Sequence, residues 1–254
     1  MNRWGGAILA LGAMSSMACG DLTGATGAKG RVNYSLYTHY EVDQLDLREV
    51  SLVTGHPQLI QTNLTEKGTD QLSGSASDIV HQVEPAEGVE VSNQDSDEDI
   101  ADVTVTVSEP GDYTLSSELD GYVFDYLELS FDSPDELELI TWTRNPDDDD
   151  FEAAEGDSID IEEGGQVTVL PIPLAGGERL AGDISVEITV FPETSAVRGE
   201  NIYGVYEQGV TSSDTPVSLY FVEPGTVTIT VSDGPNGVEA VQVFEVEAVE
   251  QPEV

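Results

Sequence analysis

The feature that most constrains this chain is a stretch that it carries twice. The clearer copy runs from Gly164 to Gly182 and consists of an alternating strand, a glycine turn and a Leu-x-Gly end. The fainter copy runs from Gly55 to Gly74, and Gly74 lies 108 positions before Gly182. A fixed offset of this size is typical of a duplicated structural unit.

Two further pairs of segments support the duplication. Glu109–Gly111 precedes an alternating segment, as Glu223–Gly225 does in the second half, and Leu36–His39 corresponds to Thr141–Arg144. The offset changes only from 105 to 114, which short insertions in loops would produce. The sequence therefore predicts one β-domain that has been duplicated.

The apolar residues alternate with polar ones, and no stretch keeps the period of an amphipathic helix. Alternation with glycine and proline turns at this spacing is typical of β-sandwiches, so we predict an all-β protein. The first repeat is expected over 31–132, the second over 133–249 and a tail over 250–254. In the second repeat Pro171 and Pro173 interrupt one strand, which we therefore expect at a sheet edge. Its other strands are expected at Leu137–Trp142, Ser158–Glu162, Ile184–Phe191, Val217–Val222, Thr226–Val231 and Val238–Glu247.

Two motifs carry a resemblance to a known family. Glu163–Val169 and Glu223–Val231 resemble the bacterial immunoglobulin-like domains of cell-envelope proteins. The first repeat shares the later motif and departs from the earlier one, where His56 and Pro57 stand in place of the glycine. The resemblance implies two tandem immunoglobulin-like β-sandwiches that act as a spacer, an adhesin segment or a binding module.

The N-terminus reads as a secretory signal over residues 1–18. Arg3 is followed by an apolar run and small residues, and this run is shorter than the roughly 20 residues of a membrane span. Cys19, the only cysteine, follows Ala18 as in a bacterial lipobox, although Ser16 stands where leucine is usual. That resemblance implies acylation of Cys19, and Gly20 after it favours the outer membrane; the alternative is ordinary cleavage after Ala18. Small residues and glycines make 19–30 a flexible tether.

The net charge restricts the partners. Asp and Glu number 50 against 8 Lys and Arg, which gives a formal charge of -42. Nucleic acid and anionic lipid would be repelled. We interpret this surface as an adaptation to a salty, halophilic habitat, because salt near 1 M shortens the Debye length to about 3 Å. The alternative is a surface that collects Ca²⁺ or basic partners.

No combination of residues indicates catalysis. The three histidines, His39, His56 and His81, are scattered, and we expect them at the surface or at strand ends rather than in a catalytic triad or zinc site. The acidic loops Asp95–Asp99 and Asp147–Asp150 lack the spacing of a complete calcium loop, so we expect solvated loops, with a Ca²⁺ site as the alternative. No other cofactor is expected.

These observations favour a non-enzymatic, lipid-anchored envelope protein that presents a binding surface to a protein or glycan. The tyrosines Tyr203 and Tyr206 suggest a contact patch, although such residues more often pack an edge strand. Two alternatives remain open. One is a structural part of an envelope assembly that faces the periplasm, and the other is a hydrolase accessory or Ca²⁺-dependent module.

Overall fold

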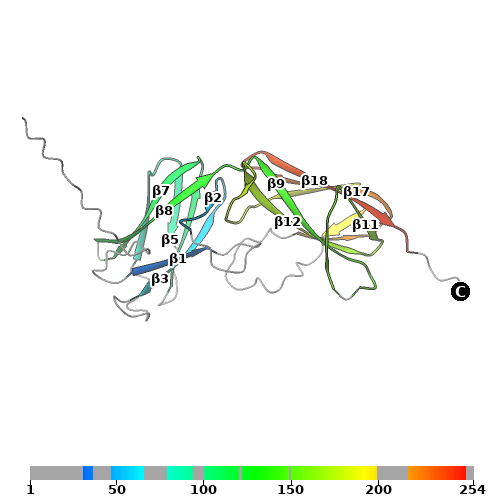
Figure 1. Cartoon of the computed structure of the whole chain (residues 1–254), viewed down its shortest axis with the longest axis horizontal. Helices are drawn as coiled ribbons and strands as arrows, with labels where there is room; N and C mark the ends of the chain where they lie inside the picture. The colour runs from blue at the N-terminus through cyan, green and yellow to red at the C-terminus, as the bar shows by residue number, and fades with distance from the viewer. Residues whose placement is uncertain are drawn as a thin grey trace, which may run out of the picture.

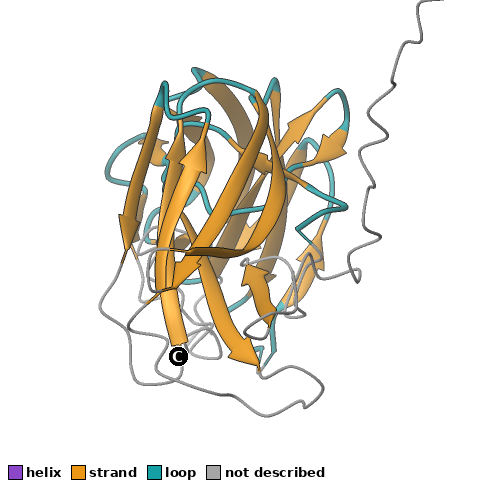
Figure 2. Ribbon diagram, turned by 90° about the vertical axis from the view of Figure 1, so that its left-hand side faces the viewer, coloured by secondary structure: helices purple, strands orange, loops and turns teal. Residues whose placement is uncertain are grey.

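The computed structural model describes residues 31–36, 47–65, 79–93, 100–119, 122–148, 150–198 and 217–249. Within these ranges the regular structure is entirely β, and the strands form two sandwiches that follow one another along the long axis of the molecule (Figure 1). Figure 2 looks along that axis and shows strands without any helix in the described residues. The prediction of an all-β, immunoglobulin-like fold is confirmed.

The first sandwich packs two four-stranded sheets against each other. One sheet has the order β1-β3-β6-β5 and the other the order β2-β8-β7-β4. The strands are β1 (Arg31–Leu36), β2 (Ser51–Val53), β3 (Gln58–Thr65), β4 (Ile79–Glu84), β5 (Val89–Asn93), β6 (Ile100–Val107), β7 (Gly111–Leu119) and β8 (Tyr122–Asp132).

The second sandwich has a larger first sheet, in the order β10-β9-β12-β16-β15, with β13 paired to β12. Its second sheet has the order β11-β18-β17-β14. The strands are β9 (Glu136–Arg144), β10 (Glu152–Ala154), β11 (Ser158–Glu162), β12 (Gln166–Ala175), β13 (Glu178–Arg179), β14 (Glu187–Phe191), β15 (Ala196–Arg198), β16 (Val217–Phe221), β17 (Gly225–Asp233) and β18 (Val238–Glu247).

The two sandwiches share one strand order. The order β1-β3-β6-β5 recurs as β9-β12-β16-β15, and β2-β8-β7-β4 recurs as β11-β18-β17-β14. In both second sheets the short first strand runs parallel to the last strand of its repeat. Gln58 and Gln166 begin matching strands, and so do Gly111 and Gly225. The residue limits of the repeats, the signal peptide and the tether stay predictions.

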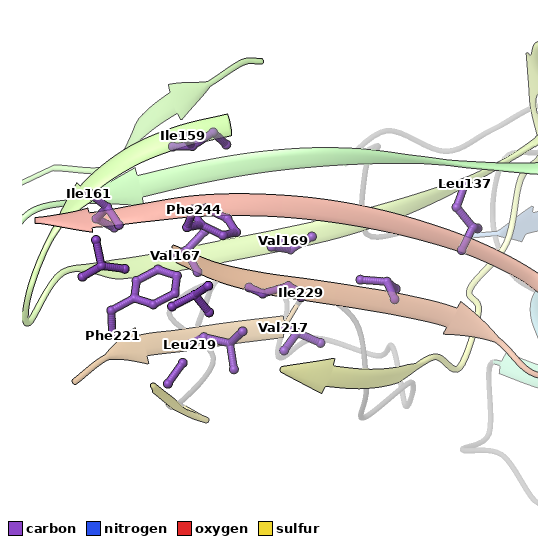
Figure 3. Close-up of a cluster of buried hydrophobic side chains, with 14 of the residues drawn as sticks. Leu137, Ile159, Ile161, Val167, Val169, Val217, Leu219, Phe221, Ile229 and Phe244 are labelled. Carbon is purple, nitrogen blue, oxygen red and sulfur yellow. The ribbon is translucent and has the colours of Figure 1, made fainter. Parts of the chain in front are cut away.

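Each sandwich has its own apolar core, built from the inward residues of its alternating strands. In the first, Tyr113 and Phe131 pack edge to face with their ring centroids 5.6 Å apart. In the second, Phe221 and Phe244 lie 5.1 Å apart among aliphatic side chains (Figure 3). Because each fully buried side chain of this size contributes about 1.5–3 kcal/mol, these two clusters supply most of the driving force for folding.

The strand that contains Pro171 and Pro173 lies in the interior of its sheet, so the expectation of an edge is wrong. β12 pairs with β9 along its length, whereas its pairing with β16 ends at Val169. β13 then pairs with Leu174 and Ala175. Both prolines therefore lie in the gap between β16 and β13, where β12 has no partner strand on that side. Proline has no N–H to donate to such a partner, so none is lost there.

Candidate functional site

The two repeats meet at a joint in which a turn of repeat 1 enters repeat 2. The turn, residues 54–57, connects β2 to β3. It lies against two segments of repeat 2, residues 181–185 before β14 and residues 233–236 at the end of β17. We call these three segments together the joint.

Backbone pairing joins the repeats at one side of the joint. Leu52 and Ala181 form a parallel β-bridge, in which the Val53 amide donates to the Ala181 carbonyl at 3.0 Å and the Ala181 amide donates to Ser51 at 2.8 Å. Ala181 packs into the core of repeat 1, and Val53 packs into the core of repeat 2. Each repeat thus completes the other's core with one side chain.

His56 is the central polar residue of the joint. Its Nε2 lies 2.9 Å from Asp233 Oδ1, and the backbone amide of Ser185 donates to its Nδ1 at 3.1 Å. Since Nδ1 accepts a hydrogen bond, the ring proton must be on Nε2, where it is donated to the Asp233 carboxylate. The geometry thus places Nε2–H against Asp233 and the Nδ1 lone pair against the Ser185 N–H.

Asp233 is fully buried and stays ionised. Burial raises the pKa of its carboxyl, but the hydrogen bonds from His56 and Asn236 outweigh burial and bring that pKa below its ordinary value. The Asn236 side chain donates to Oδ2 at 2.9 Å, and the Asn236 amide donates to Oδ1 at 3.3 Å. The carboxylate is thus satisfied by donors from both repeats.

Gln58 hydrogen-bonds to repeat 2 on the opposite side of the turn. Its Oε1 accepts from the Asp183 amide at 3.1 Å, and its Nε2 donates to the Asp183 carbonyl at 3.1 Å. Gly182 makes this approach possible, because a Cβ at that position would overlap the Gln58 amide and its φ is +107°. A side chain at residue 182 would therefore separate the two backbones.

Asn236 bonds to the turn from the other side. Its Nδ2 donates to the Thr54 carbonyl at 3.0 Å, and the Thr54 hydroxyl donates to its Oδ1 at 3.2 Å. Gly55, with φ +80°, lies so close to Pro235 that an added Cβ would come within 2.9 Å of that ring. Together with His56 and Gln58, these contacts fix both the rotation and the tilt between the repeats.

A second polar cluster lies inside repeat 1. His81 is 2% exposed, and its Nδ1 is 3.0 Å from the Ser117 hydroxyl while its Nε2 is 3.3 Å from the Thr62 hydroxyl. Ser117 also contacts the Tyr34 hydroxyl at 2.7 Å. Burial lowers the pKa of His81 to about 4, so the ring is neutral near pH 7 and bridges the two sheets as a hydrogen-bonded core residue.

Asp125 lies in the same part of the core. Its carboxylate accepts from the backbone amides of Val32 and Tyr126 at 2.8 and 2.9 Å, yet burial still raises its pKa to about 6. Burial also raises the pKa of Asp102, on β6. The two do not form an acid–base pair, because Asp102 alternates with the core residue Val103 and so faces away from the core that contains Asp125.

The structure corrects the expectation for two histidines. His56 and His81 are each 2% exposed and hydrogen-bonded, so neither is a surface residue. His39 lies outside the described residues. The signal that could have identified His56 is its position, since His56 and Pro57 replace the glycine of the second repeat's early motif.

Several other predicted residues also lie outside the described part of the chain, namely Cys19, Asp95–Asp99, Tyr203 and Tyr206. Of the second acidic loop, Asp147 and Asp148 are in a turn that follows β9. No group of three or more His, Cys, Asp or Glu side chains among the described residues is arranged to hold a metal ion. A search of the same residues finds no helix that is long and apolar enough to span a membrane.

Comparison with known proteins gives structural matches alone. No protein-family model matches the chain, and no curated protein matches its sequence. By structure, the chain is similar to the Escherichia coli adhesin FdeC, with 13% identity and a TM-score of 0.31 over 86% of this chain and 64% of that one.

Two further solved structures show likenesses of the same order. Domains 5–6 of the S-layer protein SbsC match at 15% identity and a TM-score of 0.33, over 86% of this chain and all of that one. Invasin, a bacterial integrin-binding protein, matches at 14% identity and a TM-score of 0.29, over 87% of this chain and 41% of that one.

Proposed function

We propose that this chain is a non-enzymatic, lipid-anchored protein of the bacterial cell envelope, whose two immunoglobulin-like repeats present a binding surface to a protein or glycan partner. Cys19 would carry the lipid, and residues 20–30 would form the tether. The repeats would project from the outer membrane and bind by non-covalent contact. The proposal leaves the identity of the partner open and assigns no cofactor.

The observation that carries this proposal is the joint. A flexible linker would let the second repeat sample many orientations, whereas the buried hydrogen bonds of His56, Gln58 and Asn236 hold it in one. A fixed orientation keeps a distal surface at a set distance and angle from the anchor. It also lowers the entropy that is lost when that surface binds a partner.

Packing accounts for the perturbed pKa values of His81 and Asp125. Both ring nitrogens of His81 are hydrogen-bonded to hydroxyls inside the sandwich, and Asp125 is fully buried. A general base must be within reach of a substrate proton, and buried residues of this kind are not. The described residues therefore favour a binding role over a hydrolytic one.

Replacing Cys19 with serine tests the anchor. We expect the wild-type protein to fractionate with membranes and the Cys19→Ser variant to become soluble, because the acyl chains that anchor a lipoprotein contribute about 0.8 kcal/mol per buried methylene. Immunoblots of membrane and soluble fractions measure this. A Cys19→Ala variant is the matched control, and continued membrane association of both variants would contradict lipid anchoring.

A structural role within the periplasm is the second candidate, since a rigid joint also suits a spacer in an envelope assembly. The two candidates differ in which side of the outer membrane the repeats face. Protease treatment of intact cells separates them.

A further inference from the structure

The outer face of one sheet in repeat 2 lacks charge at its centre. β14, β17 and β18 point Ile188, Ile229 and Phe244 toward the core, so the alternate residues point away from it. Six of these outward residues lie side by side, and we call them the threonine–valine face: Thr189, Phe191, Thr228, Thr230, Val241 and Val243.

Strand pairing arranges this face in two rows. Phe191 lies opposite Thr228, which lies opposite Val243. The next row has Thr189, Thr230 and Val241 in the same order. Phe191 is 73% exposed and Val241 is 59% exposed, so both side chains present apolar surface to solvent. Exposed apolar surface that is gathered on one sheet indicates a contact surface.

Carboxylates border the threonine–valine face at both ends of its strands. At one end are Glu187 and Glu239, and Glu239 accepts a hydrogen bond from Ser232 at 3.2 Å. At the other end are Asp160 and Glu245, which are paired across β11 and β18, and Glu245 accepts from Thr226 at 2.8 Å. The face is therefore an uncharged centre between two acidic borders.

The corresponding face of repeat 1 is different. It also exposes apolar side chains, with Val80 49% and Tyr126 47% exposed. There, however, carboxylates are interspersed with them: Glu84 and Glu128 both lie across from Thr114, and Glu118 lies directly opposite Val80. The uncharged centre is therefore a property of repeat 2, and repeat 1 offers a matched control.

The charge pattern selects among the classes of partner. A second copy of this chain would bring acidic borders together on two molecules that each carry a formal charge of -42, and an anionic lipid surface would be repelled as well. A neutral glycan would offer neither an apolar surface to pack on the valines nor positive charge to attract the acidic borders. A protein with an apolar centre flanked by lysine or arginine matches both, with burial at the centre and charge attraction at the edges.

We propose that the threonine–valine face of repeat 2 is a docking surface for a basic protein partner, whose own contact surface has an apolar centre flanked by cationic side chains. The inference rests on the proposed function, which it deepens by naming the surface and the chemistry of the partner. Phe191 and Val241 would be the apolar anchors. The acidic borders would accelerate association and make it sensitive to salt.

A pair of short synthetic peptides tests this on the purified full chain carrying Cys19→Ser. One peptide alternates leucine with lysine, and its control alternates serine with lysine and has the same charge. Binding is measured by fluorescence anisotropy for the parent, Val241→Glu and Val80→Glu, because both replaced valines are exposed and neither replacement disturbs a core. Amide chemical shifts locate the site that the leucine–lysine peptide occupies.

The direction in which the peptide affinity changes separates the proposal from binding driven by charge alone. Each new glutamate adds negative charge, so binding driven by charge alone would become tighter in both variants. We expect instead that Val241→Glu weakens leucine–lysine binding by about tenfold or more, while Val80→Glu leaves it within about twofold. The proposal is overturned if Val241→Glu binds as tightly as the parent, if the serine–lysine peptide binds equally well, or if the shifts map elsewhere.

A third probe tests for a glycan partner. Binding of the neutral oligosaccharide cellohexaose that is lost in Val241→Glu would overturn the proposal in favour of a glycan surface. These assays use purified protein, so they are independent of anchoring and of cell-surface exposure. Failure of the peptide assay would therefore reject the docking surface and leave the proposed function standing.

Discussion

His56 shows how one position can give two similar repeats different roles. In repeat 2 the matching residue is Gly165, because the Gly164 amide donates to the Phe221 carbonyl at 2.8 Å just as the Gly55 amide donates to the Val107 carbonyl at 2.7 Å in repeat 1. In repeat 1 the imidazole reaches Asp233 in the next sandwich. Gln58 also reaches repeat 2, at Asp183, whereas Gln166, the first residue of the matching strand, accepts from Arg144 of its own repeat.

The pair His56–Asp233 is therefore expected to couple the repeats. We predict that His56→Ala and Asp233→Ala each cost about 2–4 kcal/mol, because each leaves a buried polar partner unsatisfied, and that the double mutant shows a coupling energy of about 1–3 kcal/mol. Chemical denaturation of the four proteins measures the cycle. The exposed pair Arg179–Glu138 is the control and should couple by less than about 1 kcal/mol. Equal coupling in the two cycles would contradict the account.

Asp125 gives a prediction for pH. Burial raises its folded pKa to about 6, above the unfolded value, so the protonated carboxyl favours the fold; this contribution is full below the unfolded pKa of 3.8 and is lost as the pH rises through 6. The stability of Asp125→Asn relative to wild type should therefore rise between about pH 4 and pH 7. Urea denaturation across this range measures the difference.

His81 does not confound this test. Its lowered folded pKa has the opposite consequence, because stability is lost as the pH falls from 6.5 toward 4. Both proteins contain His81, so its contribution cancels in the difference. A constant difference between Asp125→Asn and wild type over the whole range would show that the carboxyl titrates normally.

At the scale of elements, alternation in the sequence predicted the long strands well. β11 and β18 begin and end where the period of two begins and ends, since each buries every second side chain. The short strands β10, β13 and β15 were not predicted, because two or three residues contain no period. The prolines of β12 were misleading because an edge and a gap between two partner strands look the same in sequence.

The joint could not be predicted from the sequence for a different reason. His56 and Asp233 are 177 positions apart, and neither lies in a pattern that requires the other. Local periodicity reports which face of a strand is buried, and it contains no information on which loops of two domains meet. The replacement of the second repeat's glycines by His56 and Pro57 was visible, but only the structure shows what the histidine binds.

Gly182 is the element-scale test of the joint. We predict that Gly182→Ala destabilises the protein by at least about 2 kcal/mol more than Gly177→Ala does, because the new methyl group overlaps the Gln58 amide in addition to straining the backbone. Gly177 also has a positive φ, of +82°, but no atom lies within 4 Å of an added Cβ, so its cost is limited to about 1–2 kcal/mol of strain.

Thermal denaturation and small-angle scattering give the two readouts. Gly182→Ala should lower the melting temperature and broaden the distribution of overall dimensions, because the repeats become free to move against each other. Gly177→Ala should leave the dimensions unchanged. If the two variants behaved alike in scattering, the joint would not be what fixes the orientation of the repeats.

At the scale of the whole molecule, the structure is a two-domain rod with one joint and a strongly acidic surface (Figure 1). The joint fixes repeat 2 relative to repeat 1, and the proposed lipid at Cys19 would fix the chain to a membrane. Under the proposed function its two ends would have different tasks: residues near the N-terminus would anchor the chain, and repeat 2 would present the threonine–valine face.

The most direct test of this account is protease treatment of intact cells, followed by immunoblotting for repeat 2. The account predicts that repeat 2 disappears while a periplasmic marker stays intact, because repeats that are anchored as proposed would project outward from the outer membrane. Protection of repeat 2 until the outer membrane is permeabilised would contradict surface presentation, and it would assign the rod to a structural role inside the envelope.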